Sequence, residues 1–158
     1  MTIKVGDRIP DATFHQMTSD GPGAITTDEI FKGKTVVMFG LPGAFTPTCH
    51  ANHLPGFIEH NDTIKAKGVD TIAVLATNDL FVMDAWAKAT NATGKIEFLS
   101  DTSSEFVKEI GLALDVPIFG NTRSQRFVLI AKDGVITHLG IEEGRGETTL
   151  TGASAVLA

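Results

Sequence analysis

The chain has 158 residues, of which 42% are hydrophobic and 20% charged, and its formal net charge is −6. This composition is that of an ordinary globular protein, and the length predicts one domain spanning residues 1–158. An acidic chain without clustered Lys or Arg argues against nucleic acid as a partner. No apolar run reaches the roughly 18 residues of a membrane span, and the first residues lack the layout of a signal peptide. We therefore expect no membrane association and a cytoplasmic location.

The cysteine content narrows the chemistry further. Cys49 is the only cysteine. This excludes an intramolecular disulfide and every multi-cysteine zinc site, so we expect neither a metal nor a cofactor. If Cys49 takes part in a redox cycle, the second thiol must come from outside the chain.

The first third of the chain leads into a buried strand. Residues 1–27 are rich in turn formers and predict a hairpin or an extended lead-in. Residues 26–31 predict at most one helical turn, ended by Gly33. The run at residues 35–39 is apolar on both faces and rich in β-branched side chains, which is typical of a central strand.

A Gly/Pro-rich turn then leads from this strand into a helix start. Thr46 is a good N-cap residue, and Pro47 fits the first helical position. Cys49 would then lie in the first turn, where free N–H groups and the helix dipole favour a thiolate over a thiol. A buried structural cysteine is the alternative, and the spacing alone leaves both interpretations open.

The middle of the chain predicts a βαβα series. A helix follows Cys49 up to Gly68, with a kink or offset expected at Pro55. Residues 70–76 predict a second buried strand, and Asn78 or Asp79 can cap the next helix. Consecutive strands joined by a helix are expected to be parallel, with a right-handed crossover.

The last third predicts an antiparallel end to the sheet. A short strand is expected at residues 96–100, and residues 102–105 have the spacing of a capping box. Residues 112–124 read as a surface loop. The Asp133-Gly134 pair between two apolar runs indicates a hairpin, and residues 147–158 predict a weak final helix.

Together these elements predict an α/β fold of the thioredoxin-like type, with a central mixed β-sheet flanked by helices and an N-terminal extension. In that layout the site is the helix start that carries Cys49. Thr46 stands where a Cys-x-x-Cys motif would have its first cysteine, which excludes dithiol–disulfide reductase chemistry.

The segment at residues 42–49, followed by residues 53–57, resembles the active-site signature of the peroxiredoxins, in their atypical type II or peroxiredoxin-5-like branch. The resemblance continues through the Arg126-Phe127 pair to the Asp133-Gly134 turn, and so covers nearly the whole chain.

The resemblance implies that Cys49 is the peroxidatic cysteine, which attacks a peroxide oxygen to give a sulfenic acid. Thr46 would hydrogen-bond peroxide and sulfur, Pro42 would shield the pocket from water, and Arg126 would pair with the thiolate. Breaking an O–O bond needs donors placed where negative charge moves, and the planar fork of an arginine suits this better than a lysine. Arg126 is chosen by the resemblance, since spacing alone does not separate it from Arg123.

The resemblance also implies roles around the pocket. Gly43 is expected at the substrate pocket, and His53 is expected to pack beside the site without acting as a base. Trp86, Phe81 and Met83 are interpreted as core or subunit-interface residues, because the dimers of the family use this region. A homodimer is therefore expected.

Resolution of the sulfenic acid must differ from that in some relatives. These carry a second cysteine in the strand at residues 72–75 or near the C-terminus at residues 150–153, and this chain has neither. An external thiol is implied, with glutathione and glutaredoxin favoured over thioredoxin; without it the sulfenic acid proceeds toward the sulfinic acid.

The resulting interpretation is a thiol-dependent peroxidase that reduces hydrogen peroxide and small alkyl hydroperoxides by a one-cysteine mechanism. One alternative is a cysteine hydrolase or acyl transferase that uses Cys49 with His53 or His138 as base. Another is a peroxide sensor or redox relay that does not turn over efficiently.

Overall fold

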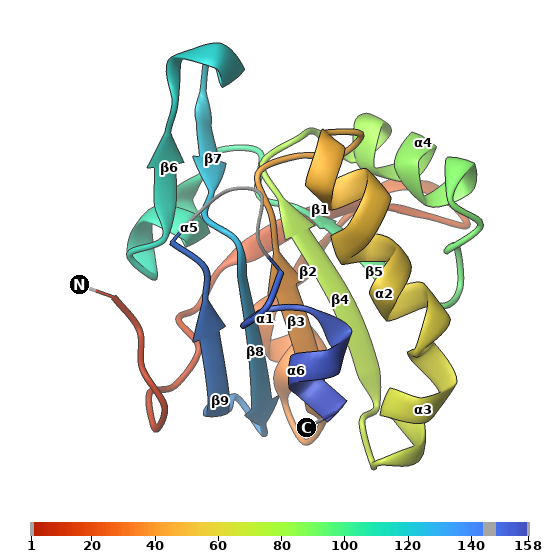
Figure 1. Cartoon of the computed structure of the whole chain (residues 1–158), viewed down its shortest axis with the longest axis vertical. Helices are drawn as coiled ribbons and strands as arrows, with labels where there is room; N and C mark the ends of the chain where they lie inside the picture. The colour runs from red at the N-terminus through yellow and green to blue at the C-terminus, as the bar shows by residue number, and fades with distance from the viewer. Residues whose placement is uncertain (1, 144–147, 158) are drawn as a thin grey trace.

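The computed structural model describes residues 2–143 and 148–157, and within them the strands of the main sheet follow the order β2-β1-β5-β4-β3-β8-β9 (Figure 1). The strands of this sheet are β1 (Thr13–Thr18), β2 (Gly21–Thr26), β3 (Thr35–Gly40), β4 (Thr71–Ala76), β5 (Glu97–Ser100), β8 (Phe127–Lys132) and β9 (Val135–Ile141). The helices are α1 (Thr27–Phe31), α2 (Leu54–Glu59), α3 (Asn61–Ala66), α4 (Leu80–Ala89), α5 (Glu105–Glu109) and α6 (Ala153–Leu157), with a π-helical turn η1 (Cys49–His53) between β3 and α2.

The central strand β3 is buried on both faces, as its apolar sequence predicts. Val37 and Phe39 point into a core shared with α2, α3, α4 and α6, whereas Val36 and Met38 point into a core shared with α1 and α5. β3 pairs parallel with β4 and antiparallel with β8. The expected thioredoxin-like arrangement of a mixed sheet between helical layers is confirmed.

The N-terminal segment forms the predicted hairpin. β1 pairs antiparallel with β2 and adds to the sheet beside β5. Thr26 then caps α1, because its hydroxyl accepts the Glu29 N–H while the Glu29 carboxylate accepts the Thr26 N–H. This capping box explains why a helix forms over only five residues.

The expected loop at residues 112–124 is wrong in detail. It contains a two-stranded antiparallel sheet of β6 (Ala113–Asp115) and β7 (Thr122–Ser124), joined through the 3₁₀ turn η2 (Pro117–Phe119). Figure 1 shows this hairpin standing clear of the main sheet. Strands of three residues are too short to display an alternating pattern, so only their turn residues are visible in the sequence.

The capping box expected at residues 102–105 is also wrong. Ser104 makes no side-chain cap and has a φ of 64°. Asp101 replaces it, since its carboxylate accepts the N–H groups of Phe106 and Val107. The capping oxygen therefore comes from just after β5, one residue before the segment that the pattern indicates.

The end of the chain forms the expected weak helix, which begins at Ala153. Residues 147 and 158 of that prediction lie outside the described residues. In the described ranges, the helices are all too short to cross a membrane. α6 packs against α2 on the same face of the sheet (Figure 1).

Candidate active site

The turn after β3 places Cys49 at the start of a helical segment. The chain is helical from Pro47, and the His50 N–H donates to the Thr46 carbonyl over 2.8 Å. Cys49 therefore lies in the first turn, as predicted. The Thr46 hydroxyl donates to the Gly43 carbonyl over 2.6 Å, so its proton is used within the turn while its oxygen keeps lone pairs to accept another hydrogen bond.

Arg126 is the arginine that touches the sulfur. Its Nη2 donates to Cys49 Sγ over 3.2 Å, and both residues are buried, with 2% and 1% of their surfaces exposed. The antiparallel pairing of Phe127 with Gly40 brings the residue before β8 beside the residue after β3. The two arginines that spacing could not separate are thus distinguished by strand register. A charged donor at this distance interacts more strongly with a thiolate than with a thiol.

A π-helical turn links the cysteine to His53. The Leu54 N–H donates to the Cys49 carbonyl, five residues back, and Pro55 follows with no N–H to give. The helix expected to run up to Gly68 is divided into η1, α2 and α3, with an irregular turn just before Pro55 and a second break at His60. The wider turn allows Cys49 and His53 to contact the same guanidinium.

His53 is buried with both ring nitrogens occupied. Nδ1 lies 2.8 Å from Nη1 of Arg126, and Nε2 lies 2.8 Å from the Thr151 carbonyl oxygen. An arginine only donates and a carbonyl only accepts, so the neutral ring with its proton on Nε2 satisfies both contacts. Burial, together with the charge of Arg126, lowers the pKa of His53 to about 3.

This arrangement argues against the hydrolase interpretation. A general base needs a free lone pair aimed at the nucleophile, and the lone pair of His53 is already used by Arg126. His138 lies in β9 opposite Ile130. That position is three residues from the site end of β8, or about 10 Å along the strand.

Several contacts hold the turn that precedes Cys49. Arg123 Nη1 donates to the Pro42 carbonyl over 3.3 Å, and the Ala44 N–H donates to Asn78 Oδ1 over 2.8 Å. A Cβ on Gly43 would lie 2.7 Å from Arg123 Nη1 and 3.3 Å from Thr46 Cγ2. A side chain at position 43 would therefore displace the Arg123 guanidinium from the Pro42 carbonyl.

A cavity of about 290 Å³ is lined by Arg126, the residue that contacts the buried sulfur of Cys49, although Cys49 itself is not among its lining residues. It combines apolar walls with the polar groups of Thr46 and Arg126. The hairpin β6–β7 supplies one wall, since the turn at its tip carries Ile118 and Phe119. The lining residues are Pro42, Thr46, Pro47, Thr48, Ile118, Phe119 and Arg126.

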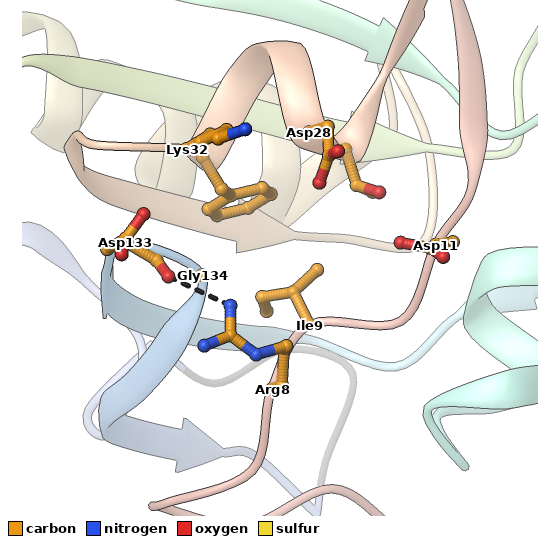
Figure 2. A pocket seen from close by; sticks show the side chains of 9 residues that line it. Arg8, Ile9, Asp11, Asp28, Lys32, Asp133 and Gly134 are labelled. Carbon is orange, nitrogen blue, oxygen red and sulfur yellow. Dashed lines mark hydrogen bonds between the residues drawn. The ribbon is translucent and has the colours of Figure 1, made fainter.

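A second cavity, of about 230 Å³, lies at the opposite end of β3 (Figure 2). Arg8 Nη1 donates there to the Asp133 carbonyl over 3.1 Å. The cavity is lined by charged side chains of both signs, which include Lys32, Asp28 and Asp11. Its lining has no cysteine or histidine. Among the described residues no group of three His, Cys, Asp or Glu side chains is arranged to hold a metal. The thiol cavity is thus the candidate active site.

Comparisons with known proteins agree with this geometry. The family model described as Redoxin matches residues 4–157. Peroxiredoxin-2C of Oryza sativa subsp. japonica is 42% identical over 157 residues, which cover 98% of this chain and 96% of that protein. The chain belongs to the peroxiredoxin family. It is a thiol-dependent peroxidase, and its single cysteine fits a one-cysteine mechanism.

Solved structures of peroxiredoxins share the fold over almost the whole chain. A reduced Prx3 from Vibrio vulnificus in complex with h2o2 is 44% identical with a TM-score of 0.94, covering 99% of this chain and 98% of that one. Peroxiredoxin 5 from Alvinella pompejana is 34% identical with a TM-score of 0.85, covering 98% and 96%. Peroxiredoxin-2E, chloroplastic, of Arabidopsis thaliana is 38% identical, and the chain spans 63% of its length.

The structure brings together most of the residues that the sequence indicates for the site, but Gly43 does not line the cavity and instead accepts the Thr46 hydroxyl with its carbonyl. Cys49, His53 and Arg126 form one hydrogen-bonded group, and Thr46 lines the cavity next to it. Sequence reasoning missed the support that Asn78, Arg123 and Thr151 give. In the sequence, Asn78 is interpreted only as a possible helix cap and Arg123 only as an alternative to Arg126. The contact of Thr151 is made by its backbone carbonyl, which the identity of the side chain does not reveal.

Proposed function

We propose that Cys49 is the peroxidatic cysteine of this peroxiredoxin and that its oxidised form is reduced by an external thiol. In the first step the thiolate sulfur attacks one peroxide oxygen. The S–O bond forms as the O–O bond breaks, the sulfur loses two electrons, and the departing oxygen takes a proton to become water or an alcohol. The 3.2 Å contact between Arg126 Nη2 and Cys49 Sγ is the observation that carries this proposal.

The surrounding residues fit the movement of charge in that step. Negative charge passes from sulfur to the departing oxygen, and Arg126, which lines the cavity and contacts Cys49 Sγ, provides a fixed positive donor. Thr46 accepts the O–H of the incoming peroxide, because its own proton is given to Gly43. Pro42 covers the cavity with a side chain that has no donor.

The size and lining of the cavity support hydrogen peroxide and small alkyl hydroperoxides as substrates. The hydroperoxide group meets Thr46 and Arg126, and the apolar walls that include Pro47 and Ile118 accommodate an alkyl substituent. The relative crystallised with h2o2 supports the smallest member of this series.

Glutathione with glutaredoxin is the reductant that we propose, with thioredoxin as the rival. A glutathione thiolate attacks the sulfur of the sulfenic acid, which gives a mixed disulfide and water. A second glutathione thiol then releases reduced Cys49 and glutathione disulfide, and glutaredoxin accelerates this exchange. The support for an external reductant is that Cys49 is the only cysteine in the sequence.

Intact-mass spectrometry tests the first step. One equivalent of hydrogen peroxide is expected to add one oxygen to the reduced protein within the mixing time and nothing to Cys49→Ser. Oxidation at the rate of an ordinary exposed thiol would refute the peroxidatic role. Turnover with glutathione and glutaredoxin is then expected. Recycling by thioredoxin alone would refute the proposed reductant, and fast oxidation without recycling by either would indicate a peroxide sensor.

A homodimer that packs beside the cavity is also proposed. Three large apolar side chains are exposed near its mouth or on the adjacent α4, with 50% of Phe45, 62% of Phe81 and 80% of Ile118 accessible. Phe45 adjoins α4, since its ring centroid lies 6.3 Å from that of Trp86, and Ile118 lines the cavity; large apolar side chains left exposed are candidates for an interface. Phe81→Glu is expected to give a monomer in analytical ultracentrifugation, whereas Val5→Glu, at an exposed apolar residue elsewhere, is not. A native protein that sediments as a monomer would refute the proposal.

We also propose a cytoplasmic location, supported by the reducing environment that a glutathione-dependent cycle needs. Fractionation of the source cells with an antibody against the chain tests it, and recovery in a membrane-enclosed or secreted fraction would contradict it.

A further inference from the structure

A buried chain of hydrogen bonds connects the C-terminal segment to the reactive sulfur. The Thr151 carbonyl contacts His53 Nε2, His53 Nδ1 contacts Arg126 Nη1, and Arg126 Nη2 contacts Cys49 Sγ, over 2.8, 2.8 and 3.2 Å. Thr151 is fully buried, and His53 is 1% exposed. The reacting sulfur is thus two side chains away from a backbone carbonyl near the end of the chain.

The carbonyl of Thr151 is itself held in place by β9 and the residue after it. The Leu150 N–H donates to the carboxylate of Glu142, which is 3% exposed, and the Glu142 N–H donates to the Arg126 carbonyl over 3.0 Å. Gly140 in β9 lies so close to this segment that a Cβ there would be 2.2 Å from the Leu150 carbonyl oxygen. The segment is therefore packed backbone against backbone.

We propose that His53 is a positioning residue for Arg126, and that the segment Leu150–Thr151 sets the tautomer in which it acts. The Thr151 carbonyl accepts only a ring with its proton on Nε2, and that tautomer leaves Nδ1 as an acceptor for the guanidinium. His53 thereby fixes one nitrogen of Arg126 while the other nitrogen faces the sulfur. This inference concerns the peroxide step alone, so it does not depend on which thiol reduces the sulfenic acid.

Packing by itself does not account for a histidine here. The ring lies against Phe39 and Phe57, with centroids 4.9 and 5.7 Å apart, and an apolar side chain would fill this space equally well. It would, however, leave the Thr151 carbonyl buried without its donor and remove the acceptor from Arg126 Nη1. Both losses act on the geometry of the guanidinium rather than on the volume of the core.

Three substitutions at position 53 test the role. His53→Leu removes both hydrogen bonds, and we expect the second-order rate constant for oxidation of Cys49 by hydrogen peroxide to fall roughly 10- to 100-fold. His53→Asn places an amide oxygen near the position of Nδ1 and is expected to recover most of this loss. His53→Gln places its amide near Nε2 and is expected to recover little. The rates are measured by stopped flow at a temperature where thermal melts show all variants folded.

A remote pair of substitutions tests the contribution of the C-terminal segment. Gly140→Ala pushes against the Leu150 carbonyl and is expected to slow the peroxide reaction several-fold, without touching any reacting residue. The matched control is Gly56→Ala in α2, where the added Cβ meets only Ala153 Cβ at 3.8 Å and the rate should stay unchanged.

Three results would overturn the proposal. One is a folded His53→Leu variant whose rate is within twofold of the native rate. Another is equal recovery by His53→Asn and His53→Gln, since a role in packing would not distinguish which nitrogen is replaced. The third is a folded Gly140→Ala variant that reacts as fast as Gly56→Ala; if Gly140→Ala does not fold, the series at position 53 decides.

Discussion

Replacing Arg126 by lysine tests the contact on which the proposed chemistry rests. The guanidinium uses two separate nitrogens, one for Cys49 Sγ at 3.2 Å and one for His53 Nδ1 at 2.8 Å. A lysine carries a single ammonium on a flexible stem and does not reproduce this planar pair of donors. Arg126→Lys therefore keeps the positive charge but loses at least one of the two contacts.

The size of the effect follows from the kind of hydrogen bond lost. A hydrogen bond to a charged group contributes about 1.5–3 kcal/mol. Because each 1.36 kcal/mol of barrier is a factor of ten in rate, the loss corresponds to roughly 10- to 150-fold. The 2% exposure of Arg126 leaves little room for water to replace the missing donor, which favours the upper part of this range.

Arg123→Lys is the matched control for this prediction. Arg123 donates to the Pro42 carbonyl over 3.3 Å and stacks on Phe119, with its guanidinium carbon 5.0 Å from the ring centroid. Burial lowers its pKa, while the nearby Cys49 sulfur raises it, so it lies within electrostatic reach of the site. We expect Arg123→Lys to slow oxidation at most about threefold, because one long, partly buried hydrogen bond of ordinary strength is altered and the contact with the sulfur is kept.

The assay is stopped-flow oxidation of the reduced protein at several concentrations of hydrogen peroxide, followed by the intrinsic fluorescence of Trp86. Second-order rate constants are compared among the native protein, Arg126→Lys and Arg123→Lys, each shown to be folded by thermal melts. Equal losses in the two variants would refute a specific role for Arg126. An Arg126→Lys rate within twofold of native would refute the whole assignment of the positive donor.

Three further predictions concern stability. The pKa of His53 is about 3 in the folded protein, against an ordinary value of 6.5. As the pH falls, the unfolded chain therefore binds a proton before the folded protein does, and stability is lost between pH 6.5 and about 3. In urea titrations, the free energy of unfolding of His53→Gln should depend less steeply on pH over this range. Burial raises the pKa of Asp101 above 3.8, although the N–H groups that its carboxylate accepts act in the opposite direction. The stability that Asp101 contributes is therefore present below pH 3.8 and is lost as the pH rises. Asp101→Asn should remove this pH dependence of the free energy of unfolding, and an unchanged dependence would contradict the prediction. Gly40→Ala would put a Cβ 2.0 Å from the ring of Phe127, and we expect about 1–3 kcal/mol of destabilisation in chemical denaturation, with native-like stability counting against this packing.

Much of the fold was accessible from local pattern. The buried strand β3, the Asp133-Gly134 turn and the helix start at Pro47 each have a signal within a few residues. The Asp133-Gly134 turn is an example, since both residues have positive φ, 49° and 79°, as a tight hairpin requires. The directions of neighbouring strands follow from the same signals, since the helices between β3, β4 and β5 make these strands parallel and the two-residue turn makes β8 and β9 antiparallel.

The parts that local spacing alone could not decide depend on how the chain folds back on itself. Asp101 replaces Ser104 as the cap of α5, because its carboxylate reaches two N–H groups across a tight turn. Arg126 and Arg123 are three residues apart, and only the register of β8 against β3 decides which one meets the sulfur. The hydrogen bond to His53 Nε2 comes from a backbone carbonyl 98 residues away. Because every residue has a backbone carbonyl, the sequence does not indicate which one makes this contact.

The C-terminal segment at residues 150–153 carries no cysteine, and two of its positions are closely packed. This part reads Leu150-Thr151-Gly152-Ala153, where the resemblance to the peroxiredoxins implies a resolving cysteine in some relatives. A Cβ on Gly152 would lie 2.8 Å from the Thr148 carbonyl oxygen, and Ala153 is 4% exposed against α2. A side chain with a thiol therefore has little space at either position unless the turn moves. The same turn presents the Thr151 carbonyl to His53, so moving it would disturb Arg126 as well. In the proposed mechanism the segment supports the guanidinium of Arg126, and a thiol from another molecule reduces the sulfenic acid.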